Sequence, residues 1–153
     1  MDRLIKLTPT LITLIAVGGI WLYGPIVQFA HYHEFADDRS VFGIANAWNV
    51  LSNIGFAGVG VWGLWRLWGH RTDPILSSGW PGYSVFLYSL ILTTAGSSFY
   101  HWSPDNFRLI WDRLPIALAC AGLLTAVSAE TNPQVNGSYR RIWLMSVAVF
   151  GVF

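Results

Sequence analysis

The longest stretch of this chain without an Asp, Glu, Lys, Arg or His side chain runs from Pro74 to Tyr100, with the sequence PILSSGWPGYSVFLYSLILTTAGSSFY. Crossing a hydrocarbon core of ~30 Å takes about 20 helical residues at ~1.5 Å per residue. These 27 residues are therefore expected to form one membrane-spanning helix. Comparable runs on either side predict further helices at Leu7–Ala30, Ser40–Trp65, Leu114–Ala129 and Ile142–Phe153.

The composition agrees with this pattern. Of the 153 residues, 54% are hydrophobic and 11% are charged, and the mean hydropathy is +0.46, which is typical of a membrane protein. We predict an all-α, polytopic transmembrane helix bundle, with about four complete helices and a partial fifth in one membrane domain over 1–153. The net charge of +1 gives no reason to expect a nucleic-acid partner. The single cysteine, Cys120, excludes an internal disulfide and is expected to pack in the core.

The positions of Lys and Arg predict how the bundle is oriented, because cytoplasmic loops carry an excess of both. Alternate loops, counted from the N-terminus, hold Arg3, Lys6, Arg66, Arg71, Arg140 and Arg141, and the intervening loops hold Arg39, Arg108 and Arg113. This difference places the N-terminus in the cytoplasm. The loop at 31–39, the end of the 74–100 helix and the start of the next helix at Asp112 then share the non-cytoplasmic face.

Three residues at that face could carry chemistry. Ser97 and His101 are spaced i, i+4 and share one side of a helix, and Asp112 follows eleven residues later. A neutral imidazole can bind zinc, a carboxylate can accept a proton, and a hydroxyl can hold a substrate oxygen. The alternative for the first pair is an interfacial histidine beside a serine that bonds its own helix. The alternative for Asp112 is an ordinary helix N-cap, since Pro115 would fall in the first turn.

Polar residues before and within the second predicted helix form another group. Asn46, Asn49 and Asn53 lie on one helical face, where they either bond neighbouring helices or line a site. Glu34 and Asp37, together with Asn46, supply the hard oxygen ligands that calcium prefers. Their spacing is not that of an EF-hand loop, and a solvated acidic loop is the alternative.

The same residues resemble a known family. The pattern Ser97-x-x-x-His101, followed by Asp112 in the setting Trp-Asp-Arg-Leu-Pro at 111–115, resembles the alkaline ceramidases. It also resembles the wider superfamily of seven-helix membrane hydrolases that includes the progestin and adiponectin receptors. The stretch AWNVLSN at 47–53, with Asn46 before it, resembles the opening of the first core helix of ceramidases.

The resemblance covers roughly residues 31–130 and makes the helix at 7–30 an added anchor. It implies a zinc ion bound by His101, with Ser97 and Asp112 as catalytic residues. It also implies a calcium site in the region of Glu34, Asp37 and Asn46, although Asn46 stands where an acid is expected.

In the family, a His-x-x-x-His on the last helix completes the zinc site, and this sequence has no counterpart. The resemblance therefore leads us to expect that the natural chain continues for about three more helices. In that case the 153 residues are an incomplete piece that binds zinc weakly.

The chemistry that the resemblance implies is hydrolysis of a lipid amide such as ceramide, inside or at the edge of the bilayer. Membrane lipids are then the expected surroundings and the substrate class. Two alternatives stay open. One is a non-catalytic lipid-binding or receptor-like member of the same superfamily, and the other is a purely structural membrane protein.

Overall fold

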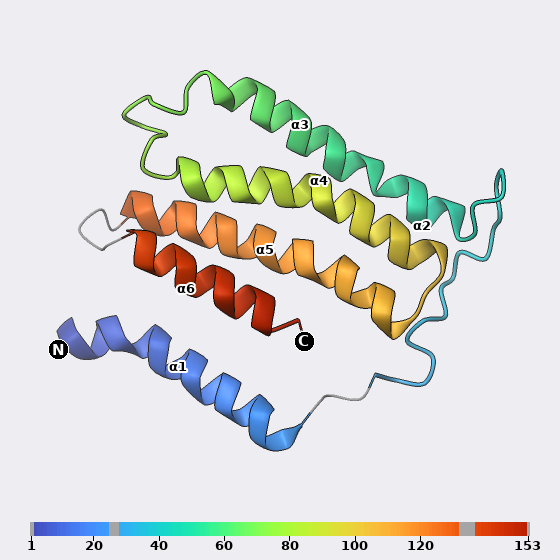
Figure 1. Cartoon of the computed structure of the whole chain (residues 1–153), viewed down its shortest axis with the longest axis horizontal. Coiled ribbons are helices and arrows are strands. Elements are labelled where there is room, and N and C mark those ends of the chain that lie inside the picture. The colour runs from blue at the N-terminus through green and yellow to red at the C-terminus, as the bar shows by residue number, and fades with distance from the viewer. Residues whose placement is uncertain (1, 25–27, 132–136, 153) are drawn as a thin grey trace. The chain divides into compact units, whose positions relative to one another are not determined.

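A computed structural model describes residues 2–24, 28–131 and 137–152 of the chain (Figure 1). Within these ranges the secondary structure consists of helices and contains no strand, which confirms the all-α prediction. The chain divides into two compact units, Met1–His33 and Glu34–Phe153. The helices are α1 (Asp2–Tyr23), α2 (Ala47–Ser52), α3 (Ile54–Trp68), α4 (Trp80–Trp102), α5 (Asn106–Thr131) and α6 (Gly137–Phe150).

The first unit contains α1, which ends before the predicted end at Ala30. Gly24 follows its last residue with a left-handed backbone (φ 81°), and the Gly24 N–H donates to the carbonyl of Ile20 at 3.0 Å. Glycine adopts this conformation without strain and commonly ends helices in this way. Residues 25–27 of the predicted helix lie outside the described ranges.

In the second unit, α3, α4, α5 and α6 lie side by side in chain order (Figure 1). Glycines allow the closest approaches. A Cβ on Gly60 or Gly63 would lie within 3.0 Å of α4, where Leu87 supplies the nearest atom in both cases. Gly55 and Gly58, earlier on the same helix, take no part in this contact, because a Cβ added to either would meet nothing within 4 Å.

The predicted helix at 40–65 is broken near its middle. It begins only at Ala47 and is interrupted at Asn53, which separates α2 from α3. A helix break frees carbonyls that need other donors. The hydroxyl of Ser98 donates to the carbonyl of Val50 at 3.2 Å, and the hydroxyl of Thr94 donates to the carbonyl of Asn53 at 2.9 Å. Both donors are on α4, so the break also ties α2 to α4.

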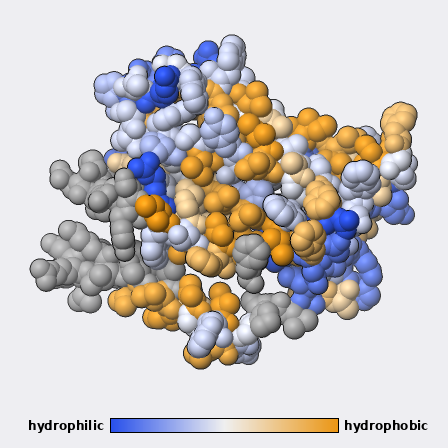
Figure 2. Space-filling view, in the orientation of Figure 1, coloured by the Kyte–Doolittle hydropathy of each residue, from blue (hydrophilic) through white to orange (hydrophobic). Residues whose placement is uncertain are grey.

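Among the described helices, α5 alone is both long and apolar enough to cross a membrane by itself. The break at Asn53 leaves α3 with 15 residues, which extend roughly 22 Å. Large apolar side chains are exposed along the helices, including Trp62, Trp65 and Leu124. Figure 2 shows hydrophobic residues over the middle of the second unit and hydrophilic residues toward its ends. Cys120 is exposed, so its predicted place in the core is wrong.

Candidate metal centre

A tight turn between α4 and α5 builds the site. One oxygen of the Asp105 carboxylate accepts the backbone N–H of Arg108 at 2.7 Å, and the Arg108 guanidinium pairs with the other oxygen. The backbone N–H of Arg108 and its positive charge hold the pKa of Asp105 below its usual value. The same guanidinium stacks 5.0 Å from the centre of the Phe99 ring. Asp105 thus caps α5 and holds the turn in place.

The prediction that a helix begins at Asp112 is therefore wrong. Since Asp105 provides the cap, α5 begins at Asn106, and Asp112 lies six residues inside it, roughly 9 Å along the axis. Ser97 and His101 lie in the last two turns of the antiparallel α4. The turn therefore places Asp112 level with them. Its carboxylate is near enough to interact electrostatically with the His101 imidazole.

Gly96 and Pro115 set the distance between the two helices at this level. Pro115 has no N–H, so the carbonyl of Trp111, four residues earlier, lacks its usual helical donor. Gly96 lies against that carbonyl, and a Cβ added there would be 2.0 Å from the oxygen. The backbones of α4 and α5 therefore meet directly beside Ser97 and Asp112. Gly96 was missed from the sequence, although it lies in a run of small residues at 95–98 that is typical of close helix packing.

Two polar atoms at the site are buried without a hydrogen-bond partner among the described residues. They are Nδ1 of His101 and one carboxylate oxygen, Oδ1, of Asp112. The Phe35 and Tyr100 rings cover the imidazole, with centroids 4.7 and 5.1 Å away. A buried, unsatisfied donor or acceptor is costly, and a bound ion or water is the usual explanation. An imidazole nitrogen is a zinc ligand, and a carboxylate oxygen beside it can accept a hydrogen bond from a zinc-bound water, so this pair fits one side of a zinc site.

Within residues 2–24, 28–131 and 137–152, no three His, Cys, Asp or Glu side chains gather as a metal site. The structure brings Ser97, His101 and Asp112 to the same level of α4 and α5, and Ser97 is only 6% exposed. Among the described residues, however, His101 provides the single imidazole at this site. A catalytic zinc usually has three protein ligands. The described residues could therefore supply only part of the ligand set that the resemblance implies.

Two of the three candidate calcium ligands, Asp37 and Asn46, form hydrogen bonds within the described structure. Asp37 accepts the backbone N–H groups of Trp48 at 2.8 Å and Asn49 at 3.2 Å, and so caps α2. The side-chain amide of Asn46 donates to the carbonyl of His101 at 2.7 Å. Glu34 precedes them in the same segment. Calcium at Glu34, Asp37 and Asn46 stays a prediction. The capping role of Asp37 was missed because it lies ten positions before Ala47, the first residue of the helix that it caps.

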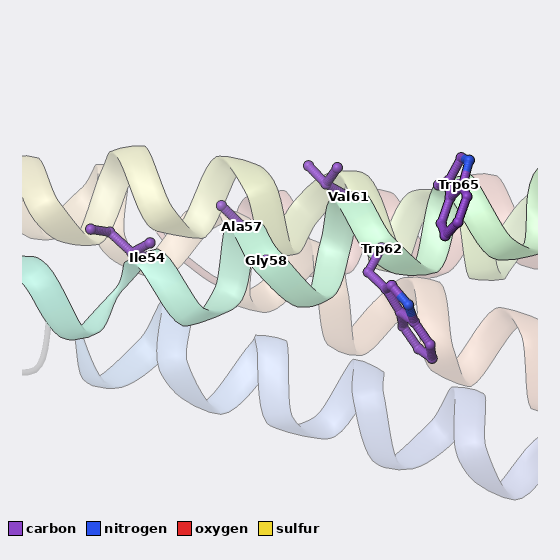
Figure 3. Close-up of a pocket in the computed structure, with 6 residues that line it drawn as sticks. All are labelled: Ile54, Ala57, Gly58, Val61, Trp62 and Trp65. Atoms are coloured by element: carbon purple, nitrogen blue, oxygen red, sulfur yellow. The ribbon is translucent and has the colours of Figure 1, made fainter.

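A separate groove of about 500 Å³ lies on the outer face of α3 (Figure 3). It contains none of the three site residues. Its lining is almost wholly apolar and consists of Ile54, Ala57, Gly58, Val61, Trp62 and Trp65.

The contact at Gly96 gives a prediction for stability. Gly96→Ala should lower the free energy of unfolding by about 1–3 kcal/mol, because the new Cβ must push α5 away from α4. The matched control is Gly58→Ala, where a Cβ meets nothing within 4 Å and helix propensity improves by up to about 1 kcal/mol. Denaturant unfolding in detergent, followed by circular dichroism, measures both. Equal stability of the two variants would contradict the close contact.

Comparison of this chain with protein-family models, with curated proteins and with solved structures gives no match.

Proposed function

We propose that this chain belongs to a multi-pass membrane hydrolase that uses zinc to cleave lipid amides such as ceramide. One observation supports this most directly. His101 Nδ1 and Asp112 Oδ1 are buried and unpartnered on neighbouring helices, next to the buried Ser97. A structural protein gains nothing from two unsatisfied polar atoms in one place, whereas a metal and its water would satisfy both.

Each residue has a role in amide hydrolysis. His101 holds the zinc, which when bound polarises the substrate carbonyl and lowers the pKa of a water molecule. Asp112 accepts a proton from the attacking water and transfers it to the leaving amine nitrogen as the C–N bond breaks. The hydroxyl of Ser97 donates a hydrogen bond to the carbonyl oxygen as negative charge develops on it. The products are a fatty acid and an amine.

The exposed surfaces of the helices support a membrane setting. Trp62, Trp65 and Leu92 are each more than half exposed. Burying these side chains in lipid is favourable because it removes a large apolar surface area from water. We propose that α3 and α4 cross the bilayer together with α5, with α2 extending α3. In this arrangement the site lies at the non-cytoplasmic end, where α2, the end of α4 and the start of α5 meet (Figure 1).

Side-specific labelling tests this topology. In a Cys120→Ser background, cysteines at Asp38 and Asp105 should react with an impermeant maleimide from the same, non-cytoplasmic side of intact cells. Cysteine at Arg71, between α3 and α4, should react only after the membrane is permeabilised. Labelling of the cysteines at positions 38 and 105 from opposite sides of the membrane would refute this arrangement.

The function is tested on the natural full-length protein, purified in detergent. Bound zinc is measured by mass spectrometry of the metal, and hydrolysis is measured on a panel of lipid amides with matched lipid esters. Stoichiometric zinc with release of fatty acid from amides supports the proposal. Stoichiometric zinc without hydrolysis supports the receptor-like alternative, and absence of zinc contradicts both.

A further inference from the structure

The side chain of Asn46 contacts the part of α4 that carries the proposed zinc ligand. Its Nδ2 donates a 2.7 Å hydrogen bond to the backbone carbonyl of His101, 55 residues further along the chain. His101 is the second-last residue of α4, which ends at Trp102. The last four carbonyls of a helix have no donor within the helix. Asn46 therefore satisfies a carbonyl that the helix leaves open, and it does so at the zinc ligand itself.

Asn46 is itself held in one place. Its backbone is left-handed (φ 48°, ψ 46°), a conformation that asparagine adopts more readily than most residues. The next residue, Ala47, is fully buried, and its N–H donates to the carbonyl of Arg39 at 3.1 Å. The Asp37 carboxylate caps α2 just beyond. A donor that is fixed in this way can define the position of its acceptor.

The same segment also contacts the ring of His101. The Phe35 ring lies 4.7 Å from the imidazole centroid, and it also packs edge-on against Tyr100 at 5.7 Å. The segment from Phe35 to Asn46 thus touches His101 at two points, the side chain and the backbone carbonyl. Two contacts on opposite ends of one residue restrict both its place and its orientation.

We propose that Asn46 is a positioning residue, which holds the backbone of His101 so that the imidazole points into the metal centre. This role rests on the proposed zinc function. It differs from the calcium ligation predicted for Asn46, because the amide nitrogen donates to protein and binds no cation. Outer residues that orient a metal ligand are typically worth 10–100-fold in metal affinity or activity.

The test uses two variants and one matched control in the full-length protein. Asn46→Gly removes the side chain and keeps the left-handed backbone free of strain. Asn46→Asp keeps the size and the backbone preference, but its ionised carboxylate cannot donate. The control is Thr94→Val, which removes another side-chain hydrogen bond between α4 and the α2–α3 segment, at the Asn53 carbonyl.

Two measurements follow. The first is amide hydrogen exchange of the metal-free protein, over a peptide that covers residues 97–104. Both Asn46 variants should exchange about 5–10-fold faster there, and Thr94→Val should not. The second is zinc affinity by chelator competition. It should fall about 10–100-fold in the Asn46 variants and stay at the wild-type value in the control.

The outcomes separate the two proposals. If the wild type binds zinc but the Asn46 variants keep both affinity and exchange rate, the positioning role is wrong and the zinc function stands. If exchange rises while zinc affinity stays unchanged, Asn46 is only a helix cap, which also overturns the positioning role. If the wild type binds no zinc, the proposed function fails, and exchange alone then shows whether Asn46 holds the end of α4.

Discussion

Asp112→Asn is expected to lower amide turnover by about 10²–10⁴-fold while leaving most of the bound zinc in place. The change preserves the size of the side chain and removes the carboxylate that we propose accepts the proton of the attacking water. Asp112 is suited to that task because one of its oxygens is buried without a hydrogen-bond partner from the described protein. Single-turnover hydrolysis and zinc content, measured on the same preparation, separate loss of chemistry from loss of metal.

The control for this variant is Asp105→Asn, a second carboxylate on the same hairpin. Asp105 caps α5, and asparagine caps helices about as well as aspartate does. We therefore expect Asp105→Asn to keep its turnover, despite the lost charge next to Arg108. A wild-type rate for Asp112→Asn across pH 6–9 would exclude its role in proton transfer.

The second large effect is expected at the proposed zinc ligand. His101→Ala should abolish stoichiometric zinc in the full-length protein and remove hydrolysis with it, because a catalytic zinc usually has three protein ligands and the variant lacks one of them. X-ray absorption of the wild type should show zinc–nitrogen distances of about 2.0–2.1 Å. The nitrogen scattering should weaken in any residual zinc that the variant retains.

His70→Ala serves as the control for a general effect of losing a histidine. His70 is exposed beyond the end of α3, and its ring bonds the Asp73 carboxylate at 2.9 Å. It should keep both zinc and activity. Undiminished zinc in His101→Ala would show that the metal, if present, is held elsewhere, and the proposed site would then have to be abandoned.

Much of the helical structure could be predicted from the pattern of charged residues alone. The run from Pro74 to Tyr100 contains most of α4, and the run from Leu114 to Ala129 lies wholly within α5. The boundaries were less accurate. Charge-free length does not report where a cap forms, so Asp105 and Gly24 moved helix ends by several residues.

The candidate site was only partly visible in the sequence. Ser97 and His101 share a helix face because of their spacing, which is a local property. That Asp112 faces them depends on the length of the turn and on Gly96, which lets α4 approach the Trp111 carbonyl. Neither can be judged from spacing within one helix.

The sequence by itself determined which segments are helical and which residues could carry zinc chemistry, because periodicity and residue type are local. Only the tertiary structure decided what those residues touch. The bond from Asn46 to His101 spans 55 residues, and the bond from Ser98 to Val50 spans 48. Such contacts join residues that are far apart in the sequence, so they depend on how helices pack and where they break. At the break near Asn53, side chains of α4 add hydrogen bonds to the carbonyls of Val50 and Asn53.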